Sequence, residues 1–224
     1  MHISFVLDSL VPQGFLKIAK HSMQDLSCIF ESVTFSKEVD QKLDHHQPGG
    51  VLHSSKIFQK RHTFKRGHYV VYIISCKLFL RRVQVAGISC RNICVVSLYD
   101  VGNQPYDLWS AAIWELVLHE LGHSFGLIPK GRKESFISSL KTNHCSNDCV
   151  MNDSLLLRSS WYHKASERKE RHSPFCIRCL NYLLQKKICN HKIKRSPQGL
   201  LFIFFLECRE FLRQVNFWSK TLVC

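Results

Sequence analysis

Residues 118–127 read LHELGHSFGL and place two histidines four positions apart, with a glutamate next to the first. Positions four apart lie on the same face of an α-helix, so His119 and His123 can reach one metal ion. Glu120 lies about 100° further round the helix, where it can hold and deprotonate a zinc-bound water. The pattern is typical of zinc hydrolases, but two histidines leave a catalytic zinc one protein ligand short.

The sequence around this stretch predicts a buried helix over residues 108–126. It is strongly apolar before the motif, with no proline until Pro129 and no glycine until Gly122. Asp107 is the expected N-cap. Gly126 can end the helix in a left-handed turn and return the chain beneath the metal, which would bring a third ligand from downstream.

Other segments have weaker but readable patterns. Continuous apolar and β-branched runs predict strands, and one amphipathic stripe predicts a helix over residues 15–26. Residues 36–68 are polar and are expected to be a loop. Residues 154–173 are polar as well and are expected to be a basic linker. The apolar run 200–206 is expected to be a buried strand or helix. The predicted strands cover residues 3–7, 69–75 and 93–99.

A second group of metal-binding residues lies downstream, in NHCSNDCVM (143–151) and FCIRC (175–179). Its cysteines form a C-x3-C and a C-x2-C, and four thiolates at such spacings typically make a closed, tetrahedral structural zinc site. Buried free cysteines are the less favoured explanation, because both pairs are tightly spaced in polar surroundings. The four candidate ligands are Cys145, Cys149, Cys176 and Cys179.

Composition limits the class of protein. Of the 224 residues, 45% are apolar, enough to fill the core of one sizeable domain. The net charge of +14 would suit nucleic acid or an acidic membrane surface if it were gathered on one face, but the basic pairs are spread along the chain. We see neither a signal peptide nor a run of the roughly 20 apolar residues that a membrane span needs. We therefore expect a cytoplasmic or nuclear protein whose cysteines are thiols and metal ligands rather than disulfides.

Taken in order, these residues resemble the archaemetzincins, a family of zinc metallopeptidases. The family signature runs HExxHxxGxxHC, followed by a second cysteine, an x-Met and a later CxxC. The resemblance extends more weakly to SLVP (9–12) and to AGISCRNICVVSL (86–98), which is similar to the family's edge strand. The matching residues are His119, Glu120, His123, Gly126, His144, Cys145, Cys149, Met151, Cys176 and Cys179.

The resemblance implies an α+β fold with α/β/α-like layering. It would have a mixed, metzincin-type sheet, a central active-site helix and a C-terminal subdomain held together by a bound zinc ion. The metallopeptidase domain would cover residues 1–184 and include the four-cysteine segment 145–179. Residues 185–224 would be a tail of unassigned structure.

The resemblance also implies two zinc ions per chain. His119, His123 and His144 would hold the catalytic zinc, and the four cysteines the structural one. Met151 would form the turn beneath the catalytic metal. In the family, two residues separate the glycine from the third histidine, and this chain has Pro129 at that histidine's position, so an insertion over residues 128–143 restores the order. The expected substrates are peptides or proteins, with cleavage of aminopeptidase type.

Two other interpretations stay open from the sequence. The chain could keep the peptidase fold and lack activity, because Pro129 stands where the family has a ligand. It could instead be a zinc-stabilised protein that binds nucleic acid through its basic surface. Glu120 argues against the second interpretation, since a purely structural zinc has no use for a carboxylate at that position. The sequence does not predict the oligomeric state.

Overall fold

The structure is a computed structural model, and the chain divides into two compact units, Met1–Leu184 and Gln185–Cys224. The fold and the candidate sites described below lie in the first unit. The predicted helix over 15–26 lies largely outside the described residues, and the apolar run 200–206 lies wholly outside them. The structure describes residues 2–8, 11, 14–15, 18, 32–36, 50–53, 58, 67–99, 105–129, 135–137, 143–152, 159–170 and 174–192.

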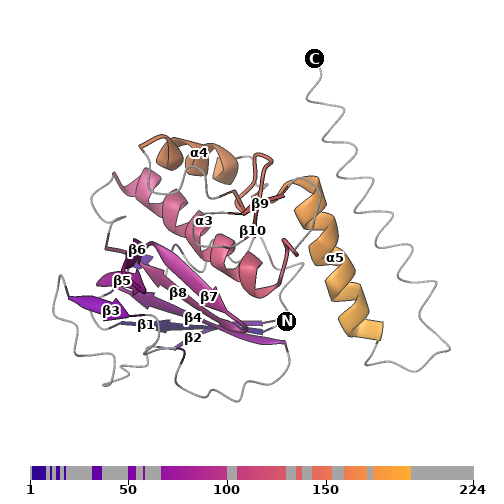
Figure 1. Ribbon diagram of the computed structural model, residues 1–224, viewed down its shortest axis with the longest axis horizontal. Coiled ribbons are helices and arrows are strands. Elements are labelled where there is room, and N and C mark those ends of the chain that lie inside the picture. The colour runs from indigo at the N-terminus through magenta and orange to yellow at the C-terminus, as the bar shows by residue number, and fades with distance from the viewer. Residues whose placement is uncertain are drawn as a thin grey trace. The chain divides into compact units, whose positions relative to one another are not determined.

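A five-stranded mixed sheet forms the base of the fold (Figure 1). Its order is β2-β1-β4-β8-β7; the first four strands run parallel, and β7 is an antiparallel edge strand. The strands predicted at 3–7, 69–75 and 93–99 are confirmed as β1, β4 and β8, and β7 lies within the segment that resembles the family's edge strand. The strands are β1 (His2–Leu7), β2 (Ser32–Ser36), β4 (His68–Ile74), β7 (Gly87–Cys90) and β8 (Ile93–Ser97).

Both faces of this sheet are buried, which explains why its inner strands are apolar without interruption. Successive side chains point to opposite faces. On β4, Val71 and Ile73 belong to one core cluster, while Val70 and Tyr72 belong to another. The first cluster lies between the sheet and the helices. The second includes side chains of a small sheet, β3-β5-β6, made of β3 (Val51–His53), β5 (Lys77–Leu80) and β6 (Val83–Val85).

Helix α3 (Tyr106–Ser124) runs across one face of the large sheet (Figure 1). Every residue from Ser110 to Gly122 is buried, and this confirms the predicted central helix. Its predicted N-cap is wrong. Pro105 occupies that position without a side-chain cap, and Asp107 lies inside the first turn, where a carboxylate still interacts favourably with the helix dipole. Gly126 has a φ of 64°, the left-handed turn expected after the helix.

Helix α4 (Ser159–Glu170) packs on α3 on the side away from the sheet (Figure 1). The sequence was interpreted here as a polar linker, and this expectation is wrong. Trp161, Tyr162, Ala165 and Arg168 are all buried, so one helical stripe faces the core although the segment is polar overall.

Two short strands and one further helix complete the described fold. Strands β9 (Ser135–Ile137) and β10 (Asn143–Cys145) pair antiparallel, and helix α5 (Ile177–Lys192) follows the second cysteine pair. The expected loop 36–68 contains strand β3, so that prediction was incomplete. Among the described residues, no helix combines the length and hydropathy that a membrane span requires.

Candidate metal centres

His119, His123 and His144 form the first candidate metal centre, which we call the histidine centre. The first two project from the same face of α3, and His144 lies in β10. Nε2 of His123 lies 3.0 Å from Nε2 of His119 and 3.1 Å from Nε2 of His144. The structure therefore brings together the three histidines that the sequence and its resemblance proposed.

This spacing fits zinc. Zinc binds imidazole nitrogen at about 2.0–2.1 Å, so two nitrogens of a tetrahedral site lie about 3.3 Å apart. The rings of His119 and His144 are stacked at 23°, while that of His123 is nearly perpendicular to both. The part of the chain that the structure describes supplies three ring nitrogens and no fourth ligand to this group, and a catalytic zinc site likewise has three protein ligands.

The protein fixes the ring of His119 in the form that a metal needs. Its Nδ1 lies 2.7 Å from the carbonyl oxygen of Val150, so Nδ1–H donates there and Nε2 keeps its lone pair for a metal. Burial, followed by the neighbouring His119 and His144, lowers the pKa of His123 to about 2. His123 is therefore neutral at physiological pH, as a ligand must be.

Glu120 lies beside the histidine centre and against the edge strand β7. A Cβ added at Gly87 would lie only 2.6 Å from Oε1 of Glu120, so the carboxylate occupies space that any other residue at position 87 would fill. Burial raises the pKa of Glu120 to about 8, and a hydrogen bond with Ser89 opposes the rise. A cation held by the histidines would favour the ionised form. This placement suits a group that exchanges protons beside a metal.

Met151 lies under the same helix turn. It is fully buried, and a Cβ added at Gly122 would come within 2.1 Å of its sulfur. Glycine inside a helix costs about 1 kcal/mol relative to alanine, so a packing reason at this position is expected. The close approach of Met151 to α3 between His119 and His123 supplies that reason.

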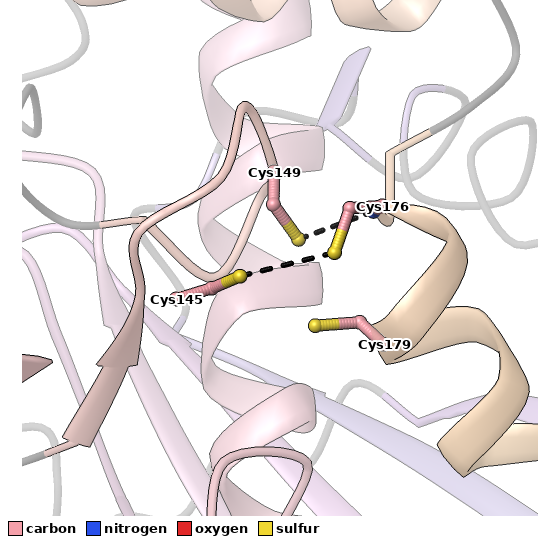
Figure 2. Close-up of side chains that lie close together, drawn as sticks. All are labelled: Cys145, Cys149, Cys176 and Cys179. Atoms are coloured by element: carbon pink, nitrogen blue, oxygen red, sulfur yellow. Dashed lines mark hydrogen bonds between the residues drawn. The ribbon is translucent and has the colours of Figure 1, made fainter. Parts of the chain in front are cut away.

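Cys145, Cys149, Cys176 and Cys179 form the second candidate, the cysteine centre. Figure 2 shows Cys145 and Cys149 at the end of β10 and in the loop after it, and Cys176 and Cys179 at the start of α5, with all four sulfurs pointing to a common point. The sulfurs lie within 4.8 Å of one another, and those of Cys145 and Cys176 are 3.8 Å apart. Zinc–sulfur bonds of about 2.3 Å place two sulfurs of a tetrahedron about 3.8 Å apart, so the cluster fits zinc.

The chemistry of the cluster agrees with this geometry. Hydrogen bonding among the sulfurs, with Cys149 first, lowers the pKa of Cys145 to about 6, and the same kind of contact lowers the pKa of Cys176. The pKa of Cys149 moves upward because its S–H donates to the neighbouring sulfurs, which keeps the proton on Cys149. The backbone N–H of Cys176 also donates to Sγ of Cys149 at 3.3 Å. Thiolate is the form that binds zinc, so four thiols gathered in this way would release protons when the metal binds.

One loop, residues 144–151, contributes to both centres, and we call it the shared loop. His144 directly precedes Cys145, and Val150, whose carbonyl accepts from His119, directly follows Cys149. The loop is closed by a bond from the N–H of Cys145 to the carbonyl of Met151 at 2.9 Å. A second bond, from the N–H of Val150 to the carbonyl of Pro174 at 2.7 Å, ties it to the segment ahead of α5.

Part of the insertion at 128–143 forms a strand that pairs with β10. His144 is opposite Phe136 and Cys145 is opposite Ser135. The third histidine is therefore held by a hairpin rather than by a short connection after Gly126. Sequence reasoning did not find Gly87, Ser89 or the carbonyl of Val150, because their roles depend on which strand and loop lie next to α3. Gly122, a glycine inside the predicted helix, was the sequence feature that could have indicated a close contact such as the one with Met151.

Several solved structures are similar to this chain. Archaemetzincin from Archaeoglobus fulgidus, crystallised with malonate, shares 19% identity with a TM-score of 0.55, over 81% of this chain and 99% of that one. Archaemetzincin from Methanopyrus kandleri shares 21% identity with a TM-score of 0.57, over 84% and 95% of the two chains. A zinc-dependent peptidase from Methanocorpusculum labreanum matches with a TM-score of 0.47 at 18% identity, over 81% and 99%.

These matches show that the chain has the archaemetzincin fold, an α+β fold built on a mixed sheet. No protein-family model matches the sequence, and no curated protein matches it.

Proposed function

We propose that this chain is a zinc-dependent peptidase whose reaction takes place at the histidine centre. The observation that carries the proposal is the convergence of three imidazole nitrogens, at 3.0 and 3.1 Å, beside a buried glutamate. A structural metal site has no use for that glutamate or for an open coordination position. The archaemetzincin fold, which the chain shares with two solved archaemetzincins, adds support.

His119, His123 and His144 would hold the zinc. When bound, zinc supplies a Lewis acid that polarises a carbonyl group and makes water more acidic. Glu120 would accept the proton of the attacking water at its carboxylate and later deliver it to the leaving amine. Ser89 and the open space at Gly87 would keep the carboxylate at the edge of the sheet, beside the reacting atoms.

We infer a second, structural zinc in the cysteine centre, giving two per chain. Four thiolates close the coordination shell, so this metal would not take part in hydrolysis. Its role would be to hold the shared loop, and with it His144 and the carbonyl of Val150. Four thiols at this spacing suit a reducing compartment such as the cytoplasm, where a disulfide would not persist.

Peptides or proteins are the proposed substrates. The edge strand β7 lies next to α3, and no described strand pairs with its outer edge, so an extended peptide could pair there while its carbonyl faces the histidine centre. Cleavage of aminopeptidase type belongs to the same proposal, and it rests on the resemblance alone.

The experiment is hydrolysis of a fluorogenic peptide library by the wild-type chain and by Glu120→Gln. The isosteric amide cannot accept a proton, so hydrolysis should fall by a factor of about 10² to 10⁴ while the zinc content stays unchanged. Free amino groups formed from unlabelled peptides would identify the bond cleaved. Equal activity in the variant would show that another group, or another site, carries the reaction.

A further inference from the structure

Arg168 is a buried cation on α4 that contacts acidic groups from two other segments. Its side chain is 4% exposed. Nε and Nη2 donate to the two carboxylate oxygens of Glu115 on α3, at 2.9 and 2.6 Å. Nη1 donates to Oδ1 of Asp148 at 2.5 Å. One guanidinium group therefore joins α4, α3 and the loop of the cysteine centre.

The two carboxylates that Arg168 binds lie close in sequence to candidate metal ligands. Glu115 precedes His119 by four residues on α3, one helical turn, and is itself fully buried. Asp148 lies between the two loop cysteines, directly before Cys149. Trp161 of α4 donates its indole N–H to Glu115 at 2.9 Å, which completes a polar network between the helices.

A purely stabilising role does not account for this network. A buried ion pair is often no more stabilising than apolar side chains of the same size, because both charges must leave water. Apolar side chains would hold α3 against α4, but they would have no means of fixing Asp148. A guanidinium offers several donors in one rigid plane, so it can bind Glu115 by two bonds and orient Asp148 by a third.

We infer that Arg168 is a positioning residue for the cysteine centre, which through Asp148 holds the C-x3-C loop in the form where all four sulfurs converge. The inference rests on the proposed binding of zinc by these cysteines and is independent of peptide hydrolysis. The histidine centre is affected indirectly, because His144 and Val150 flank the same loop.

The test uses Asp148→Ala in the full chain. The Asp148 side chain is 55% exposed, and its removal leaves the pair between Arg168 and Glu115 intact, so folding should be preserved. Cobalt(II) is titrated into the metal-free protein, and sulfur-to-cobalt charge-transfer bands report the cysteine centre alone. Affinity at these bands should fall about tenfold to a hundredfold, and their position should change. Asp148→Asn keeps an acceptor oxygen and should recover part of the loss.

Two further variants separate positioning from simple loss of charge. Glu170→Ala removes an exposed carboxylate at the end of the same α4 and should leave the bands unchanged. Arg168→Lys keeps the positive charge but loses the planar guanidinium group. The double variant with Asp148→Ala should bind cobalt no more weakly than the weaker-binding single variant, because both changes remove the same contact.

The outcomes are distinguishable. Wild-type bands and affinity in both Asp148→Ala and Arg168→Lys would overturn the inference and leave the zinc site standing. A wild-type chain with no thiolate–cobalt bands would overturn the proposed cysteine centre, and this inference with it.

Discussion

Gly87 shows how a single residue without functional groups can set the position of the proposed base, Glu120. It lies on β7, and Oε1, Cγ and Cδ of Glu120 occupy the space where a side chain would begin, at 2.6, 2.7 and 2.9 Å from an added Cβ. Strands usually avoid glycine, so its presence at the point of closest approach to α3 has a spatial explanation.

We predict that Gly87→Ala displaces the Glu120 carboxylate and lowers hydrolysis about a hundredfold, the usual consequence of a misplacement near 1 Å. Zinc content should stay at the wild-type value, because no ligand contacts this position. The measurement is kcat/KM alongside elemental analysis. Gly14→Ala is the matched control, since nothing lies within 4 Å of a Cβ added there. Full activity in Gly87→Ala would contradict the proposed place of the base.

At the scale of elements, α4 packs on α3 with a buried ion pair, Arg168 and Glu115, between them. Burial raises the pKa of Glu115, and the hydrogen bonds from Arg168 and Trp161 oppose that rise. Removing the cation would therefore leave a buried carboxylate without compensation.

Arg168→Met should destabilise the chain by about 3–5 kcal/mol, as breaking buried ion pairs generally does. The double variant Arg168→Met with Glu115→Leu should recover most of this loss, because no uncompensated charge remains. Urea unfolding of the zinc-loaded proteins gives both free energies. A double variant as unstable as the single one would show that apolar packing cannot replace the pair.

The helices and strands differ in how well the sequence predicted them. Strands β4 and β8 and helix α3 are buried on most sides, so long apolar runs identify them. Helix α4 was missed because its buried stripe, Trp161, Ala165 and Arg168, includes a cation that composition assigns to solvent. Strand β9 was missed because three residues are too few for periodicity to show.

The candidate site was predicted only where its residues follow one another in a fixed spacing. The motif on α3 identified His119, Glu120 and His123 directly. His144 was found through the cysteine beside it, although an insertion separates it from the motif. Gly87 and Arg168 act through contacts between elements, so no local pattern could indicate them.

For the whole molecule, the shared loop contributes residues to both centres. The segment from His144 to Met151 contributes one residue to the histidine centre and two to the cysteine centre, and the carbonyl of Val150 accepts a hydrogen bond from His119. Loss of zinc from the cysteine centre should free this loop. Loss of zinc from the histidine centre should leave the four thiolates on their own zinc.

We predict an asymmetric dependence between the centres. Cys176→Ser combined with Cys179→Ser should weaken zinc at the histidine centre by tenfold or more, although neither residue contacts it, an effect of the size expected for lost supporting groups. His144→Ala should leave the cysteine centre at wild-type affinity. Zinc exchange monitored with a chromogenic chelator would measure both. Independent losses in the two variants would contradict the coupling.

The central claim is that His144 completes a zinc site with His119 and His123, and zinc per chain tests it most directly. Elemental analysis of the purified wild-type chain should give two zinc ions. His144→Ala should give one, resistant to mild chelation because thiolates hold it. A single zinc in both proteins, or two in both with unchanged affinity, would contradict the account.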